Sequence, residues 1–458
     1  MSAPLDRAVI PGAGALRPFH FPDVQRHQLA NGLQVLVAEN HAFPVATVDL
    51  VLPSGGLAEP EDRAGVASLT SGLLESGAGE RSAAEVAEAV DALGLALESG
   101  ISWDSTLAGF TALRSRLDAA VGILADLVRR PAFPLREVER IRDERLAGLV
   151  QRRADPGGLA EELAAHFTFA PGHPFARRLG GPAEVLSSLG RGDVEAFHAT
   201  RYVPMGGTLA AAGDVTLAEV VALAEAHFGD WEGAPPPSGA PVPENRVAQT
   251  TLFLADRAGA VQSEVRVGHV GMERTADDYF AVTVMNAILG GTFSSRLNLN
   301  LREKLGYTYG ISSGFSTRKL PGTFAVASAL QSEGTAHSVS EILRQMREMQ
   351  DELVTPAELD DARNYLAGIF PLGLQTTDGL AGRLSTIAVY GFPDDYFDHY
   401  RDRLLAVTAD EVREAARRRL MPGRASVVIV GDAAALRGPL EALGVGPVEM
   451  VETSVVLK

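Results

Sequence analysis

The feature that most constrains the fold of this chain is an internal repeat. A polar-capped helix, a proline turn, an apolar strand and a Gly-Asp pair occur in this order near the end of each half. Near the front of each half, Val66 matches Val282 and Leu73 matches Leu289. The sequence therefore predicts two copies of one domain. Three matched pairs in the rear part keep a constant offset of 218 residues: Val194 and Val412, Pro204 and Pro422, and Asp214 and Asp432.

A proline-rich stretch separates the two copies. Residues 232–246 read EGAPPPSGAPVPENR, and their prolines and glycines leave few backbone donors and no apolar period, as is typical of an extended linker. We therefore expect an N-terminal domain at 1–231 and a C-terminal domain at 247–458. A chain of 458 residues is too long for one core but suits two large domains.

Each half begins with strand patterns, continues through several helices and ends on a strand. Val45–Leu52 and Ser263–Val270 are expected strands, and Asn31-Gly32 is expected to form a two-residue hairpin turn. This order predicts an α+β fold in which helices cover one face of a mainly antiparallel sheet.

Local signals place several core-packing helices. Ser82 and Glu85 predict a capping box before a helix that starts at Ala83, and Thr355 with Pro356 predicts the start of another. The stretch HSVSEILRQMREMQ is expected to be helical, with one buried stripe formed by Val339, Ile342, Leu343 and Met346.

Charge and composition exclude several classes of protein. The formal net charge is −17, and no block of Lys and Arg is interleaved with aromatic residues, so nucleic-acid binding is not expected. The chain has no cysteine, which leaves His, Asp and Glu as the only residues that could hold a metal. No stretch approaches the ~20 apolar residues of a membrane-spanning helix. The chain begins without a signal-peptide pattern, so we expect a cytoplasmic protein, or a periplasmic one if a signal peptide was removed.

Five stretches of the chain resemble one known family. They are LANGLQVLVAEN, EDRAGVASLTSGLLESGA, HPFARRLGGPAEVLSSL, FHATRYVPMGGTLAAAGD and LGGTFSSRLNLNLREKLGYTYGISSGF. Over nearly its whole length the chain is similar to the pitrilysin-type zinc peptidases, which include the mitochondrial processing peptidase and its bacterial half-size relatives. The resemblance implies two homologous domains arranged as a half clamshell.

The zinc motif of that family is lost. Active members carry HxxEH, in which two His ligands share a helix face and the Glu activates a zinc-bound water. The corresponding residues here run from Ser68 to Gly72, with Ser71 at the position of the Glu. The third ligand of the family, a Glu, corresponds to Ala147 or Gly148. The resemblance therefore implies no catalytic residue and no metal site in this chain.

No other motif replaces the lost one. The ten histidines lie at least seven residues apart, so no local pair can share a metal, although a composite site from distant residues stays open. His173 in PGHPF is expected to be a turn residue, Asp277-Asp278 a pair of helix-start charges, and Asp394-Asp395 an exposed turn. No GxSxG, P-loop or GxGxxG motif supports a serine hydrolase or a nucleotide-binding protein.

One functional element of the family is retained. Arg302 and Tyr309 in LREKLGYTYG match the Arg and Tyr that, in the resembling enzymes, hold the substrate backbone beside the zinc. We expect Arg302 near a helix end and Tyr309 on the following strand, on the same face as Tyr307 and Ile311. The structural alternative is that the Arg complements the helix dipole and the Tyr is half-buried in the sheet.

The resemblance implies the non-catalytic subunit of a heterodimeric zinc metallopeptidase. A homologous partner that bears HxxEH would supply the zinc, and this chain would close the chamber and bind a peptide or unfolded protein through Arg302 and Tyr309. On this interpretation the chain is inactive alone and forms part of a metalloendopeptidase complex. Two alternatives remain, a structural core-type subunit and a stand-alone peptide-binding homodimer.

Overall fold

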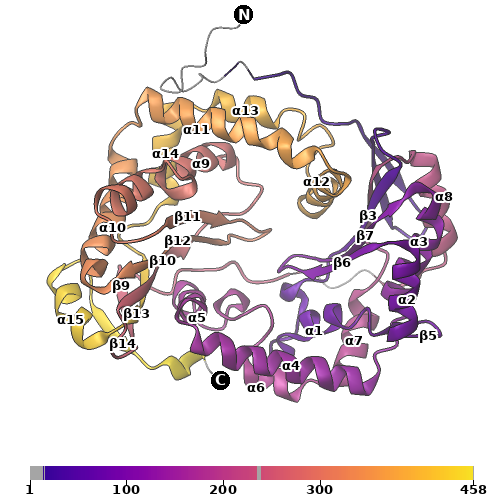
Figure 1. The fold of residues 1–458 in the computed structure, drawn as a ribbon, viewed down its shortest axis with the longest axis horizontal. Helices are drawn as coiled ribbons and strands as arrows, with labels where there is room; N and C mark the ends of the chain where they lie inside the picture. The colour runs from indigo at the N-terminus through magenta and orange to yellow at the C-terminus, as the bar shows by residue number, and fades with distance from the viewer. Residues whose placement is uncertain (1–13, 15, 235–238, 457–458) are drawn as a thin grey trace, which may run out of the picture.

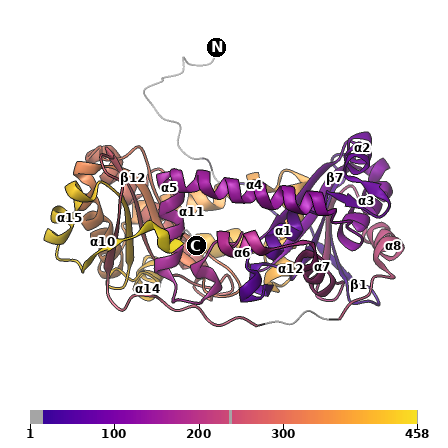
Figure 2. The ribbon, with the colours of Figure 1, turned by 90° about the horizontal axis from the view of Figure 1, so that it is seen from below.

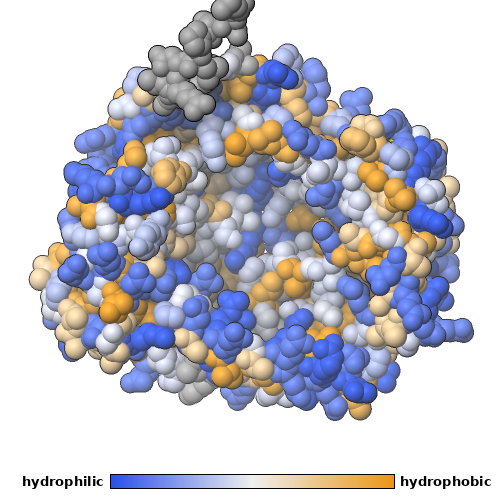
Figure 3. All heavy atoms as spheres, in the orientation of Figure 1, coloured by the Kyte–Doolittle hydropathy of each residue, from blue (hydrophilic) through white to orange (hydrophobic). Residues whose placement is uncertain are grey.

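The computed structural model describes residue 14, residues 16–234 and residues 239–456, and shows two sheet-containing halves that curve around a central opening (Figure 1). The first half lies on the right and along the bottom of that view, and the second half on the left and top. Figure 3 shows the hollow in the middle of this face, bordered by both hydrophilic and hydrophobic residues. This arrangement confirms the expected α+β clamshell.

The first sheet has six strands in the order β1-β2-β8-β3-β7-β6. The pair β2–β8 is parallel, and the other neighbours are antiparallel. The strands are β1 (Val24–Gln28), β2 (Gln34–Glu39), β3 (Val45–Leu52), β6 (Ala96–Ile101), β7 (Thr106–Leu113) and β8 (Thr208–Gly213).

The second sheet has the order β11-β12-β10-β13-β9-β14, in which β9 pairs in parallel with both β13 and β14. Five strands of each sheet follow the same order, so the internal repeat read from the sequence is a repeat of topology. The strands are β9 (Thr251–Asp256), β10 (Gln262–Val270), β11 (Ile311–Ser316), β12 (Thr323–Gln331), β13 (Ser426–Gly431) and β14 (Val448–Val451), and a separate two-stranded ladder joins β4 (Gly77–Ala78) to β5 (Arg81–Ser82).

Helices pack on both faces of each sheet, so the expectation of one covered face was wrong. On one face each sheet carries helices of its own half. In the first half they are α1 (Val66–Gly72), α2 (Ala83–Leu93), α3 (Leu117–Arg129), α4 (Leu135–Ala154), α6 (Ala183–Ser188), α7 (Arg191–Arg201) and α8 (Leu217–Phe228), and in the second α9 (Tyr279–Asn286), α10 (Thr335–Asp351), α11 (Pro356–Ile369), α13 (Tyr400–Ala406), α14 (Ala409–Arg419) and α15 (Ala433–Ala442).

The other face of each sheet is covered by a helix from the opposite half. Helix α5 (Pro156–Thr168) packs on β10 and β13, and its Leu163 and Phe167 share a core cluster with Phe253 of β9. Helix α12 (Thr377–Tyr390) packs on β3 and β8 of the first sheet. Figure 2 shows α4 running along one side of the molecule and leading into α5 beside the second sheet. The two halves are therefore joined by exchanged core helices as well as by the linker.

Most local predictions are confirmed, and one turn is corrected. The capping boxes of Ser82 and Thr355 are present, and the stripe from Val339 to Met346 is buried. The turn around Asn31-Gly32 spans five residues between Gln28 and Gln34 rather than two, since the amide of Leu29 donates to the carbonyl of Leu33.

The predicted linker lies between α8 and β9. Its residues 235–238 lie outside the described residues, and 239–246 contain no helix and only one bridge, from Asn245 to Phe169. In the described parts of the chain, no helix is both long and apolar enough to span a bilayer.

Candidate functional site

The degenerate zinc motif lies on α1 in the first half. Gly65 precedes the helix with φ 98°, and a Cβ there would lie 2.5 Å from the carbonyl oxygen of Gly180, so the helix start requires glycine. Val66, Leu69 and other apolar residues face the core. Ser68 and Gly72, which are i and i+4, lie on the remaining face, where two histidines could share a metal.

A guanidinium occupies that face. Arg145 of α4 donates from Nη1 to Ser68 Oγ and from Nη2 to the Ser68 carbonyl, both at 2.7 Å. A Cβ added to Gly72 would lie 2.4 Å from Arg145 Nη2. Burial lowers the pKa of Arg145, and among the described residues no carboxylate lies within ion-pair distance of it. The face that would hold a zinc ion therefore holds a fixed cation, which a metal ion would repel.

The third-ligand position needs a correction. Ala147 and Gly148, where the sequence placed it, are exposed, and a Cβ on Gly148 would meet nothing within 4 Å. The side of α4 that packs inward carries Arg145 and, one turn later, buried Leu149. Counting along the sequence missed the helix phase by one or two residues, but neither Leu149 nor Arg145 is a zinc ligand.

The described part of the chain contains no group of three or more His, Asp or Glu residues placed to hold a metal. His173 lies in a turn, as expected, where Nδ1 accepts from the Phe175 amide and Nε2 lies 2.9 Å from the Pro241 carbonyl. Asp278 forms a two-pronged ion pair with Arg419. These groups have structural partners.

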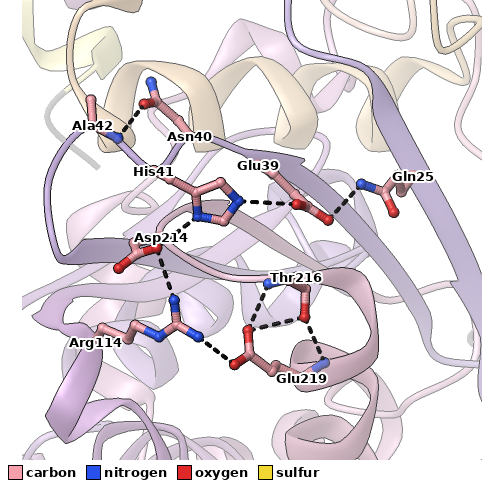
Figure 4. Close-up of polar contacts among 9 residues, drawn as sticks. All are labelled: Gln25, Glu39, Asn40, His41, Ala42, Arg114, Asp214, Thr216 and Glu219. Atoms are coloured by element: carbon pink, nitrogen blue, oxygen red, sulfur yellow. Dashed lines mark hydrogen bonds and ion pairs between the residues drawn. The ribbon is translucent and has the colours of Figure 1, made fainter.

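An exposed polar network at the end of β2 is also structural (Figure 4). His41 lies between two carboxylates, with Nδ1 2.7 Å from Asp214 and Nε2 3.1 Å from Glu39. These hydrogen bonds raise the pKa of His41. Arg114 also binds Asp214, and links it to Glu219. Because both ring nitrogens of His41 are hydrogen-bonded to carboxylates, neither is free to bind a metal ion.

The second half brings Arg302 and Tyr309 together. Both line one cavity of about 280 Å³, together with Gln262, Tyr307 and Gln331. Arg302 lies in the last turn of the π-helical segment η6 (Asn298–Lys304), as expected for a helix end. Its side chain is one-third exposed and lies 4.3 Å from the ring centre of Phe293.

Tyr309 does not lie on a strand, which corrects the sequence prediction. It is 93% exposed in the loop that precedes β11, which begins at Ile311. The loop is nevertheless fixed to the sheet, because the hydroxyl of Thr308 donates to the carbonyls of Gly310 and Ala329. The backbone of Tyr309 is therefore fixed while its phenol ring points into solvent. This contradicts the alternative in which Tyr309 is half-buried in the sheet for a structural reason.

Arg145 is the site residue that the sequence reasoning missed. It lies 77 residues from Ser68 in the chain, and nothing local marks it among the many arginines of α4. Its signal is the helix phase: Arg145 and Leu149, four residues apart, share the inward side of α4.

The chain is similar to proteins of one peptidase family. The family model described as insulinase, peptidase family M16, matches residues 34–159, and the model described as peptidase M16 inactive domain matches residues 188–366. An uncharacterized zinc protease of Mycobacterium tuberculosis is 29% identical over 92% of this chain and 94% of that protein. A Helicobacter pylori protein named as a non-peptidase homolog is 23% identical over 85% of this chain and 90% of its own length.

Three further similarities concern one eukaryotic protein and two solved structures. A probable mitochondrial-processing peptidase subunit beta of Schizosaccharomyces pombe is 24% identical over 79% of this chain and 80% of that protein. A crystal structure described as a peptidase M16 inactive domain from Pseudomonas fluorescens superposes with a TM-score of 0.84 at 25% identity, covering 89% of this chain and 98% of that chain. A Helicobacter pylori protease structure shares the fold, with a TM-score of 0.79 at 19% identity over 89% of this chain and 99% of that one.

Proposed function

Because this chain belongs to peptidase family M16 and carries neither zinc-ligating histidine, we propose that it is the non-catalytic subunit of a two-chain zinc peptidase. Its partner is a homologous subunit that bears HxxEH and supplies the zinc. This chain closes the chamber and presents Arg302 and Tyr309 to a peptide or unfolded protein.

One asymmetry carries the proposal. The partly exposed side chain of Arg302 and the exposed side chain of Tyr309 line one cavity in the second half, whereas in the first half Arg145 fills the face of Ser68 and Gly72. A peptide carbonyl that leaves water needs a donor, and a guanidinium and a phenol hydroxyl are both donors. The chain thus offers groups that bind a peptide backbone without the groups that cleave it.

The names of the relatives support a division of labour. The similar protein of Schizosaccharomyces pombe is named as one subunit of a processing peptidase, and similar bacterial proteins are named both zinc protease and non-peptidase homolog. A family in which both kinds occur can combine one of each. The cytoplasm is the proposed compartment, with the periplasm as the alternative.

A structural core-type subunit is the second candidate. It would keep the clamshell and the partner contact, but Arg302 and Tyr309 would have no role. The exposure of Tyr309 argues against it, since a phenol ring with no packing role in this chain gains nothing from being held in solvent.

The test is co-purification of this chain from its native source, followed by a peptide-cleavage assay and metal analysis of each subunit. We expect a homologous HxxEH subunit in the complex, zinc in that subunit, and cleavage only when both chains are present. In the reconstituted complex, Arg302→Ala and Tyr309→Phe should slow cleavage without changing assembly. Arg347→Ala on the exposed face of α10 and Tyr365→Phe on α11 are matched controls, and both should leave the rate unchanged. A chain that is monomeric in the native extract, or that cleaves alone, would refute the proposal.

A further inference from the structure

An exposed phenyl ring lies beside Arg302. The side chain of Phe293 is 66% exposed, and its ring centre lies 4.3 Å from the guanidinium carbon of Arg302. Phe293 belongs to none of the hydrophobic clusters that the described residues form. A ring this exposed adds little to stability through burial. Phe293 therefore contributes to the molecule through its contact with Arg302 and not through a core.

The loop that carries Phe293 is anchored on both sides of the ring. Asn298, which is 7% exposed, donates from Nδ2 to the carbonyl of Thr292 at 3.2 Å and to a carbonyl of β11 at 2.7 Å. Arg296 forms a two-pronged ion pair with Glu358 of α11, with N–O distances of 2.6 and 3.0 Å. The backbone of Phe293 is therefore fixed to the sheet and to α11, and the ring is held out from it.

The guanidinium of Arg302 has few partners of its own. Its Nε lies 3.5 Å from Oε1 of Glu303, whose side chain is half exposed. Among the described residues no other carboxylate lies within ion-pair distance of it, and no hydrogen bond fixes it. An arginine side chain has many rotamers, so a guanidinium without fixed partners samples several positions. The Phe293 ring and the Glu303 carboxylate are thus the two neighbours that can orient Arg302.

These two neighbours have different consequences for a ligand. A carboxylate accepts N–H donors of a guanidinium and neutralises its charge, so Arg302 bound to Glu303 has less to offer a peptide carbonyl. An aromatic ring attracts the cation through its quadrupole and leaves the N–H groups free to donate. Phe293 does not line the cavity that Arg302 and Tyr309 share, so it acts on a ligand there through Arg302.

We propose that Phe293 is a positioning residue for Arg302. Its ring holds the guanidinium in the cavity shared with Tyr309 and keeps it from closing on Glu303, ready to donate to the carbonyl of a bound peptide. The inference rests on the proposed function, which makes Arg302 a peptide-binding residue, and it adds the residue that prearranges it. A side chain that is oriented before the ligand arrives loses less conformational freedom on binding.

The first test is a double-mutant cycle in the reconstituted complex. Phe293→Ala should lower kcat/KM by about three- to tenfold, the size of a partly desolvated cation–π contact. In an Arg302→Ala background the same substitution should change kcat/KM by less than about twofold, whereas a structural role of the ring would give the same loss in both backgrounds. Phe43→Ala is the matched control, because Phe43 is 70% exposed between β2 and β3, and it should leave the rate unchanged.

Conservative variants and a second-site change make the test specific. Phe293→Tyr and Phe293→Trp keep an aromatic face and should keep kcat/KM within about twofold of wild type, whereas Phe293→Leu keeps apolar bulk alone and should behave as Phe293→Ala. Adding Glu303→Gln to Phe293→Ala should recover about twofold or more of the lost kcat/KM, because the neutral amide no longer attracts the guanidinium.

A spectroscopic measurement tests the contact in the isolated chain. With isotope-labelled arginine, the Nε–H resonance of Arg302 is the one that disappears in Arg302→Lys. Phe293→Leu should shift this resonance, because the ring current of a phenyl group acts on protons within a few ångströms. Phe43→Leu should leave it in place. An Arg302 resonance that does not respond to Phe293→Leu would overturn the proposal.

The outcomes separate this inference from the proposed function. If Arg302→Ala slows cleavage and Phe293→Ala does not, the proposed function stands and only the positioning role is refuted. An equal loss from Phe293→Ala with and without Arg302 also refutes that role, since the ring then acts on the fold or on the substrate directly. If Arg302→Ala and Tyr309→Phe both cleave at the wild-type rate, the proposed function fails and the role of Phe293 fails with it.

Discussion

The fixed cation beside α1 predicts that restoring the zinc motif will not restore zinc binding. The triple variant Ser68→His, Ser71→Glu and Gly72→His rebuilds HxxEH on the correct helix face, and Leu149→Glu adds a carboxylate on the inward side of α4. A zinc ion held by imidazoles at 68 and 72 would lie near the guanidinium of Arg145, which contacts Ser68 and would lie 2.4 Å from a Cβ at position 72. We expect this four-residue variant to bind zinc poorly while Arg145 is present.

The repulsion can be estimated from the geometry. Two unit charges about 4 Å apart interact by about 4 kcal/mol at an effective dielectric constant near 20, so a divalent ion and a guanidinium repel by about 8 kcal/mol. At ~1.4 kcal/mol per tenfold, this corresponds to a weakening of zinc binding by about six orders of magnitude in the dissociation constant. Sterics act in the same direction, because a Cβ at position 72 would lie 2.4 Å from Arg145 Nη2.

Zinc affinity is measured by competition with a chromogenic chelator and by calorimetry. Adding Arg145→Ala to the four-residue variant should strengthen zinc binding by at least a thousandfold, allowing for relaxation of the side chain. Arg140→Ala, on the exposed side of the same helix where Arg140 pairs with Glu137 and Glu144, is the matched control and should change nothing. Tight, stoichiometric zinc in the variant that keeps Arg145 would refute the reasoning.

Three further predictions concern peptide binding, pH and the exchanged helices. In the proposed complex with its partner, Tyr309→Phe or Arg302→Ala should lower kcat/KM by roughly five- to a few-hundred-fold, because an unmade buried hydrogen bond costs ~1–3 kcal/mol. The loss of transition-state stabilisation in the double mutant should be smaller than the sum of the two single losses. Steady-state kinetics at constant zinc content is the check, and wild-type rates in both single mutants would show that the pair is structural. Asp49 lies under α12 and accepts a hydrogen bond from Ser385, and burial raises its pKa from the ordinary value of 3.8 to about 6. Its ionised form therefore opposes folding, so Asp49→Asn should stabilise the protein by up to about 3 kcal/mol above pH 6 and by nothing near pH 4. A gain in stability that does not depend on pH, measured by denaturant unfolding, would contradict this. Leu163→Ala, in the helix that the first half contributes to the second sheet, should destabilise the second half by ~2–5 kcal/mol. The measurement is the hydrogen-exchange protection of β10 and β13. A loss of protection confined to the strands of the first half would contradict the prediction.

The sequence was sufficient for the repeat of one domain but not for the order of the strands or for the exchanged helices. Matched valines and prolines at a constant offset predict one topology twice, and both sheets have it. Helices α5 and α12 carry ordinary apolar stripes, and such a stripe indicates that a helix is buried without indicating which sheet it covers. That choice depends on contacts between residues far apart in the chain, such as Phe167 with Phe253 and Asp49 with Ser385.

Local sequence patterns also predicted only part of the candidate site. Helix positions were predicted well: Ser68 and Gly72 share a face of α1, and Arg302 lies in a last helical turn. The error at Tyr309 arose because GYTYG has alternating residues typical of a strand, whereas Gly306, at φ 68°, turns the chain and the backbone reaches β11 only at Ile311. The contact of Arg145 with Ser68 joins two helices that are far apart in the chain, so no short sequence pattern predicts it.

The repeat itself supplies the final argument for a partner. Between α1 and β6 the first half has α2, whose buried residue is Val86, and between α9 and β11 the second half has η6, which carries Arg302. At the offset of the α1 match, Ser68 corresponds to Val284, which is fully buried. Each half therefore holds apolar core where the other holds its polar site. Arg302 and Tyr309 lie in the second half only, and in the first half Arg145 occupies the face of Ser68 and Gly72. On the proposed function, cleavage needs a second chain whose first half keeps the zinc motif, and we expect the isolated protein to bind peptide without turnover.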